Sequence, residues 1–167
     1  EKRLDEVAKI YKSSSINQMI PGFLIFIGIA ANLHNLNDIL PDTYTNVSSV
    51  VLIIGISKLI DMTAGINGSI IMTSKYYRFD LVSMIFLVLL SILLNYLLIP
   101  VYGITGAAIA TATSLFLYNM IKGIYVWLKF RMQPLSTKLI IVIFLSLIIL
   151  LGSLQVERIG NLYVDLL

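Results

Sequence analysis

The stretch GISKLIDMTAGINGSIIMTSKYYR, residues 55–78, decides how the chain is organised. It continues an apolar run that is long enough to cross a bilayer, yet it carries Lys58 and Asp61 one helical turn apart. Ionisable side chains at membrane depth are costly, and they normally face the interior of a helix bundle or a watery cavity. We therefore expect this helix to carry the residues on which function depends.

The composition of the whole chain predicts a membrane protein. Of its 167 residues, 58% are hydrophobic and only 13% are charged, whereas about a quarter of the residues in a soluble domain are charged. The mean hydropathy is +0.92. The apolar residues form blocks of about 20, the length that crosses roughly 30 Å of hydrocarbon as a helix. The predicted fold class is all-α, a polytopic transmembrane helix bundle. The chain has no cysteine, which excludes disulfides and thiol catalysis.

The apolar blocks divide the chain into segments. Residues 1–15 are polar and basic, and we expect a cytoplasmic loop or amphipathic helix there. The transmembrane domain covers 16–155, with spans at about 16–33, 47–72, 79–99, 104–127 and 139–154. Pro21 predicts a kink or a helix start in the first span, and Pro100 with Gly103 predicts a turn after the third. Residues 156–167 would begin an extracytoplasmic segment. Because the chain opens on Glu1 and closes in mid-pattern, we expect a piece of a longer protein.

The basic residues predict the orientation of the spans. Ten of the 12 Lys and Arg residues fall in or beside the three segments on one side, namely Lys2, Arg3, Lys9, Lys12, Lys75, Arg78, Lys122, Lys129, Arg131 and Lys138. Cytoplasmic loops carry this excess, which puts the N-terminus of this segment in the cytoplasm. The net charge of +3 therefore reflects orientation in a cytoplasmic membrane, and no nucleic-acid partner is expected.

The second span has a polar face when it is projected as an ideal helix. An arc of about 120° at 100° per residue holds Ser57, Lys58, Asp61, Ala64, Gly65 and Gly68. Lys58 lies roughly 17 Å along the helix from Val47, near the middle of the bilayer, and Asp61 at i+3 is its natural partner. Two interpretations remain open. The two residues form a structural pair that allows insertion, or Lys58 faces a cavity and contacts an anionic or sugar-rich substrate.

Further polar and small residues are candidates for lesser roles. Asn17 lies near the inner mouth of the first span, and Asn95 and Asn119 are expected to hydrogen-bond between helices. Gly106, Ala110 and Ser114 recur at i+4 and form a small-residue face for close helix packing. No metal cluster, phosphate loop, nucleophile motif or paired-carboxylate site occurs in the sequence. We therefore expect no catalytic residue, no metal and no cofactor, and an enzyme is not predicted.

Three stretches resemble one family of membrane transporters. The run NYLLIPVYGITGAAIATATS (95–114) resembles a signature of bacterial polysaccharide-biosynthesis flippases. These belong to the multidrug/oligosaccharidyl-lipid/polysaccharide, or MATE-like, exporter superfamily. KLIDMTAGINGSIIMTSKYYRFD (58–80) resembles the preceding helix and its cytoplasmic turn in these proteins, and IYKSSSINQ (10–18) extends the likeness.

The resemblance implies a longer protein with two six-helix lobes around a central cavity. This chain would be part of the C-terminal lobe, and its partners would be the bilayer and the missing N-terminal lobe. The substrate would be an undecaprenyl-diphosphate-linked oligosaccharide, flipped across the membrane for polysaccharide or O-antigen synthesis. Members of this family commonly use charged cavity residues to hold the diphosphate and sugars. The resemblance implies that role only for Lys58, with Asp61 as its partner. The alternatives are a cation-coupled multidrug exporter of the same fold and a non-transporting membrane assembly subunit.

Overall fold

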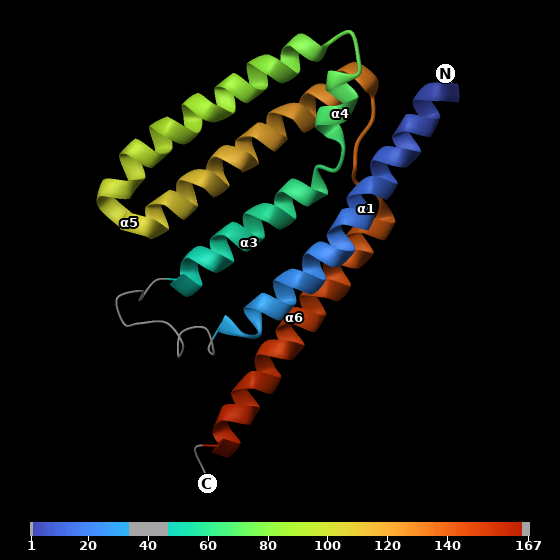
Figure 1. Ribbon diagram of the computed structural model, residues 1–167. Helices are drawn as coiled ribbons and strands as arrows, with labels where there is room; N and C mark the ends of the chain where they lie inside the picture. Colours follow the sequence, from blue (N-terminus) through green and yellow to red (C-terminus); the bar gives the residue numbers. More distant parts are fainter. Residues whose placement is uncertain (1, 34–46, 165–167) are drawn as a thin grey trace.

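The computed structural model describes residues 2–33 and 47–164, with side chains for 4–33 and 47–153 (Figure 1). All regular structure in these ranges is helical and they contain no strand, so the predicted all-α class is confirmed for them. The helices are α1 (Lys2–Ala30), α3 (Val47–Thr63), α4 (Asn67–Met72), α5 (Tyr77–Phe130) and α6 (Thr137–Val164). The last of these continues into the stretch 156–167 that the sequence assigns to an extracytoplasmic segment.

Helix α5 is a hairpin rather than a single rod. Its backbone leaves helical geometry at Gly103, with φ 57° and ψ −134°, a region that residues with a side chain rarely adopt. The first arm (77–102) and the second arm (104–130) then run antiparallel, side by side (Figure 1). The predicted third and fourth spans lie within these arms. Each arm exceeds the roughly 20 residues that cross a bilayer.

Helix α1 runs unbroken through Pro21. Its buried side chains recur every three or four residues and form a single face of Tyr11, Ser15, Met19, Phe23, Phe26 and Ala30. Pro21 itself is exposed, so its ring and its missing N–H fall on the side of the helix away from this packing. The expectation that a helix begins near Pro21 is therefore wrong, because the helix begins at Lys2 and joins the expected cytoplasmic segment to the first span.

Two apolar clusters hold the helices together. One joins α1, α4 and the second arm of α5 through Tyr11, Ile70, Ile71, Val126 and Met132. The other joins α1, α3 and α6 through Met19, Phe23, Phe26, Leu59 and Leu139. Helix α3 packs most extensively against α5, and α6 packs along α1. One side of α6 is therefore covered by α1.

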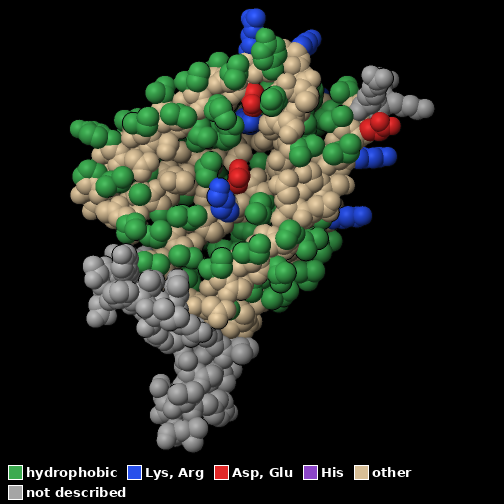
Figure 2. Space-filling view, in the orientation of Figure 1, with side chains coloured by type: hydrophobic (Ala, Val, Ile, Leu, Met, Phe, Trp, Pro, Cys, Tyr) green, Lys and Arg blue, Asp and Glu red, His purple; other side chains and the backbone are tan. Residues whose placement is uncertain are grey.

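Much of the remaining surface is apolar. Among the residues that the structure describes, two helical stretches are long and apolar enough to cross a membrane, Leu4–Ala30 and Tyr77–Phe130, and Thr137–Ser153 is a shorter apolar helix. Large side chains along the first arm of α5 are open to the surroundings, and Leu89 is 62% exposed. Figure 2 shows hydrophobic side chains spread over one face, with basic side chains mainly at its upper and right-hand margins. Apolar surface on this scale indicates contact with lipid or another protein.

Candidate functional site

The helix predicted over 47–72 is broken in the middle of its polar face. Helix α3 ends at Thr63 and α4 begins at Asn67, and Gly65 between them has φ +56°. This left-handed geometry suits glycine, because a β-carbon there is strained. A Cβ added to Gly65 would also lie 2.5 Å from Ser15 Oγ of α1. The continuous helix of the sequence projection is therefore wrong beyond Thr63, and the break brings the chain close to α1.

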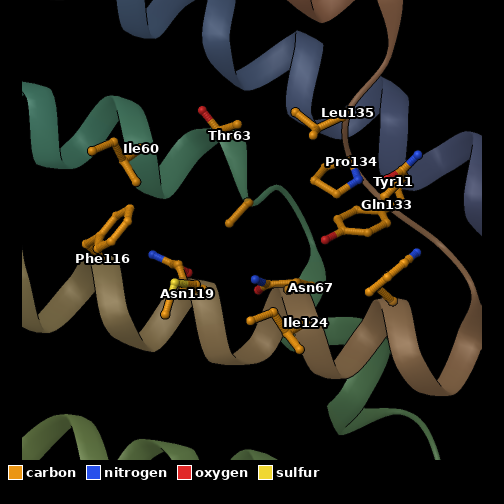
Figure 3. Close-up of a pocket in the computed structure, with 14 residues that line it drawn as sticks. Tyr11, Ile60, Thr63, Asn67, Phe116, Asn119, Ile124, Gln133, Pro134 and Leu135 are labelled. Atoms are coloured by element: carbon orange, nitrogen blue, oxygen red, sulfur yellow. The ribbon is translucent and has the colours of Figure 1, made fainter.

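A cavity of about 470 Å³ lies beside this break (Figure 3). Its walls come from α1, α3, the start of α4, the second arm of α5 and the connection to α6. The lining is mostly apolar and aromatic, with a few polar side chains, and it comprises Tyr11, Ile60, Thr63, Ala64, Asn67, Phe116, Asn119, Met120, Gly123, Ile124, Trp127, Gln133, Pro134 and Leu135. An apolar pocket with a few placed polar groups is the usual form of a small-molecule site.

Two polar side chains on the cavity wall lack partners. Tyr11 is fully buried and Asn67 is 5% exposed, and neither the Tyr11 hydroxyl nor the Asn67 Nδ2 has a hydrogen-bond partner among the described residues. In Figure 3 the Tyr11 ring extends from α1 with its hydroxyl directed into the cavity. Buried polar groups are normally satisfied, and these two residues line the cavity with hydrogen-bonding capacity that no described residue uses.

The Asp61 carboxylate is held by a residue of another helix rather than by Lys58. Asn119 Nδ2, on the second arm of α5, donates to Asp61 Oδ1 at 2.8 Å. This bond confirms the expectation that Asn119 links helices, whereas Asn95 bonds the Ser91 carbonyl of its own helix and that expectation is wrong. No ion pair between Lys58 and Asp61 occurs in the described structure. The predicted structural pair is therefore not formed.

Lys58 is exposed and lines a second groove, of about 370 Å³, between α1 and α3. The other walls of this groove are apolar and include Phe26, Gly55 and Leu59. Within the described ranges its ammonium has no carboxylate within ion-pair distance. Since a cation beside apolar walls has little to neutralise it, Lys58 is available to an anionic group from outside the chain.

A different ion pair is buried, between the two arms of α5. Lys122 Nζ lies 2.6 Å from Asp80 Oδ1, and the two side chains are 5% and 20% exposed. The same ammonium donates to the Tyr118 hydroxyl at 2.9 Å. A Cβ on Gly68 of α4 would lie 2.7 Å from Lys122 Nζ, so Gly68 leaves room for this ammonium. The pair ties the two arms of the hairpin together beside α4.

The other predicted residues have separate locations. Ser57 is buried with its hydroxyl unpartnered, and Asn17 is exposed on α1. The predicted small-residue face of Gly106, Ala110 and Ser114 is buried, and at Gly106 an added Cβ would overlap the backbone of Leu98 on the first arm. The structure thus brings Gly65 and Asp61 near the cavity, while Lys58 and Asn17 lie apart from it.

Sequence reasoning missed the residues with the most informative contacts. Tyr11 and Asn67 lie in segments that read as interfacial or off the polar arc, and Lys122 counted only as a marker of orientation. One signal was available. Asp80 sits at the start of an apolar span and Lys122 near the end of the next, so antiparallel packing of the two spans places opposite charges at one level.

In comparisons with known proteins, no family model, curated protein or solved structure matches this chain.

Proposed function

We propose that this chain is part of a membrane transporter that moves a lipid-linked oligosaccharide, carried on undecaprenyl diphosphate, across the bacterial cytoplasmic membrane. The observation that carries the proposal is the broken α3–α4 helix beside a cavity of about 470 Å³ with unpartnered polar side chains. Helices interrupted at membrane depth commonly form transporter binding sites, where the freed backbone faces a cavity. The sequence motifs at 95–114 and 58–80 supply the substrate class.

In this proposal the helices cross the membrane several times, with the N-terminus of the segment in the cytoplasm. Lys58 meets the diphosphate in the separate groove between α1 and α3, because it is exposed and has no carboxylate partner among the described residues. Asp61 forms no ion pair with it in the described structure, and the carboxylate accepts a hydrogen bond from Asn119 Nδ2. The missing lobe of the longer protein completes the site.

The cavity lining favours a second candidate, a cation-coupled exporter of apolar drugs. Tyr11, Phe116 and Trp127 contribute aromatic surface, and no Lys or Arg lines this cavity. Aromatic walls suit a flat apolar or cationic molecule. Under this second proposal Asp61 carries the coupling charge and Lys58 is dispensable.

Substitution of Lys58 in the full-length protein separates the two. Lys58→Ala should abolish surface-polysaccharide assembly while the protein remains in the membrane at its normal level, because an unpartnered cation for the diphosphate is lost. Lys138→Ala is the matched control, since Lys138 is also exposed but lies outside both cavities. Normal glycan display in Lys58→Ala would sink the flippase proposal, and lost drug tolerance in Asp61→Asn would then support the exporter.

A further inference from the structure

Two lysines gather around one aromatic ring at the end of the α5 hairpin. Lys75 Nζ lies 5.2 Å and Lys129 Nζ 5.7 Å from the centroid of the Tyr76 ring. The ring is fixed by edge-to-face packing against Tyr125 and Phe130, with centroids 5.8 Å and 5.9 Å away. We name Lys75, Tyr76 and Lys129 the basic cluster.

The basic cluster has an excess of positive charge. Both lysines are exposed, and neither forms an ion pair in the part of the chain that the structure describes. Asp80, the acidic residue in the first turn of α5, is already engaged with Lys122. Because like charges near one ring repel each other, an anion that contacts both ammonium groups would relieve that repulsion.

An apolar groove adjoins the basic cluster. It has a volume of about 330 Å³ and runs between α1, α4 and the end of α5, with walls that include Leu4, Val7, Ile70 and Met132. Two residues that line the groove contact Tyr76 of the cluster. Phe130 lines the groove and packs on Tyr76, and Ser74 lines the groove while its Oγ accepts from the Tyr76 backbone N–H at 3.0 Å. A ligand could therefore occupy both at once.

We propose that the basic cluster and this groove together bind an anionic phospholipid, with the phosphate headgroup on Lys75 and Lys129 and an acyl chain in the groove. Charge complementarity selects the headgroup, since polybasic sites beside membrane helices attract anionic lipids. A zwitterionic lipid would add its own cation to the cluster. A soluble phosphate would leave the apolar groove empty. This site goes beyond the proposed transport and does not depend on it, because it lies apart from Lys58 and uses none of the residues of the cavity beside the helix break.

The test titrates phosphatidylglycerol or phosphatidylcholine into the detergent-purified chain and counts bound lipid by native mass spectrometry. Phosphatidylglycerol should bind more tightly than phosphatidylcholine. The double variant Lys75→Gln/Lys129→Gln should bind phosphatidylglycerol roughly 10- to 30-fold more weakly, because each lysine beside a membrane surface raises the affinity for an anionic lipid by about fivefold. The charge-matched control Lys12→Gln/Lys138→Gln removes two exposed cations elsewhere and should change binding by less than about twofold.

A second variant examines the groove without changing charge. Ser69 lines the groove and is exposed, so Ser69→Phe should fill it and weaken long-chain phosphatidylglycerol much more than a short-chain form. Circular dichroism checks that every variant keeps its helix content. Equal losses in the double variant and its charge-matched control would overturn the proposal, as would equal binding of the two lipids. Full competition by excess inorganic pyrophosphate would also overturn it, because the ligand would then be a soluble phosphate.

Discussion

Breaking the Lys122–Asp80 pair should destabilise the hairpin more than removing both charges. Lys122 is 5% exposed and Asp80 is 20% exposed, with 2.6 Å between Nζ and Oδ1. Lys122→Met removes the cation and leaves a largely buried carboxylate unpaired. Such a loss costs about 3–5 kcal/mol when both groups are fully buried, and the partial exposure of Asp80 places this case near the lower limit, at about 3 kcal/mol. The double variant Lys122→Met/Asp80→Leu should stay within about 1 kcal/mol of the original chain, because apolar side chains replace a costly buried pair.

With the single variant Asp80→Leu as the third value, a double-mutant cycle measures the coupling energy between the two residues directly. Reversible unfolding in mixed micelles, titrated with a denaturing detergent and followed by circular dichroism, supplies the free energy of unfolding for each variant. Lys138→Met removes an exposed cation and should change that free energy by less than about 0.5 kcal/mol. A coupling below about 0.5 kcal/mol, or a double variant as unstable as Lys122→Met, would refute the idea that this pair ties the arms together.

Two other substitutions address the cavity and the helix break. Gly65→Ala should lower the free energy of unfolding by about 1–3 kcal/mol, since its φ of +56° is strained for alanine. The control Gly28→Ala, whose Cβ meets nothing within 4 Å, should not lower it, and thermal unfolding compares the two. Tyr11→Phe should leave the free energy of unfolding unchanged or raise it by up to about 1 kcal/mol, because the lost hydroxyl has no partner among the described residues. A decrease of more than about 1 kcal/mol in the free energy of unfolding, measured by chemical denaturation, would mean that the Tyr11 hydroxyl has a hydrogen-bond partner.

The turn at Gly103 could be predicted because local signals agree there. Two apolar blocks flank Pro100 and Gly103, and a backbone at φ 57° and ψ −134° needs a residue without a β-carbon. The same reasoning failed at Pro21. Proline inside a helix removes one backbone hydrogen bond and crowds the carbonyl of residue i−4, which predicts a break. Helix α1 nevertheless continues through Pro21, and the sequence does not say that this proline lies on its exposed side.

The contacts of the charged residues could not be predicted from spacing. A helical projection places Lys58 and Asp61 on one face, but it does not show what the neighbouring helix offers. Asn119, 58 positions away along the chain, donates a hydrogen bond to the Asp61 carboxylate, and Lys58 forms no ion pair with it in the described structure. Gly65 adds a second difficulty, because glycine occurs inside many membrane helices, and only the closeness of Ser15 and the positive φ show that here it ends one.

The polar groups within the apolar bundle fall into two classes, those with hydrogen-bond partners inside the bundle and those without. The residues without partners are the better candidates for a functional role. Lys122 is buried and has both a carboxylate and a hydroxyl within hydrogen-bond distance, so two of its three N–H donors are already used inside the bundle. Lys58 is exposed, while Tyr11 and Asn67 are buried with bonds unmade. A buried polar group without a hydrogen-bond partner costs about 1–3 kcal/mol of stability. Phenylalanine in place of Tyr11 and leucine in place of Asn67 would avoid that cost. Polar side chains at these positions are therefore better explained by a ligand that completes their bonds than by the fold alone.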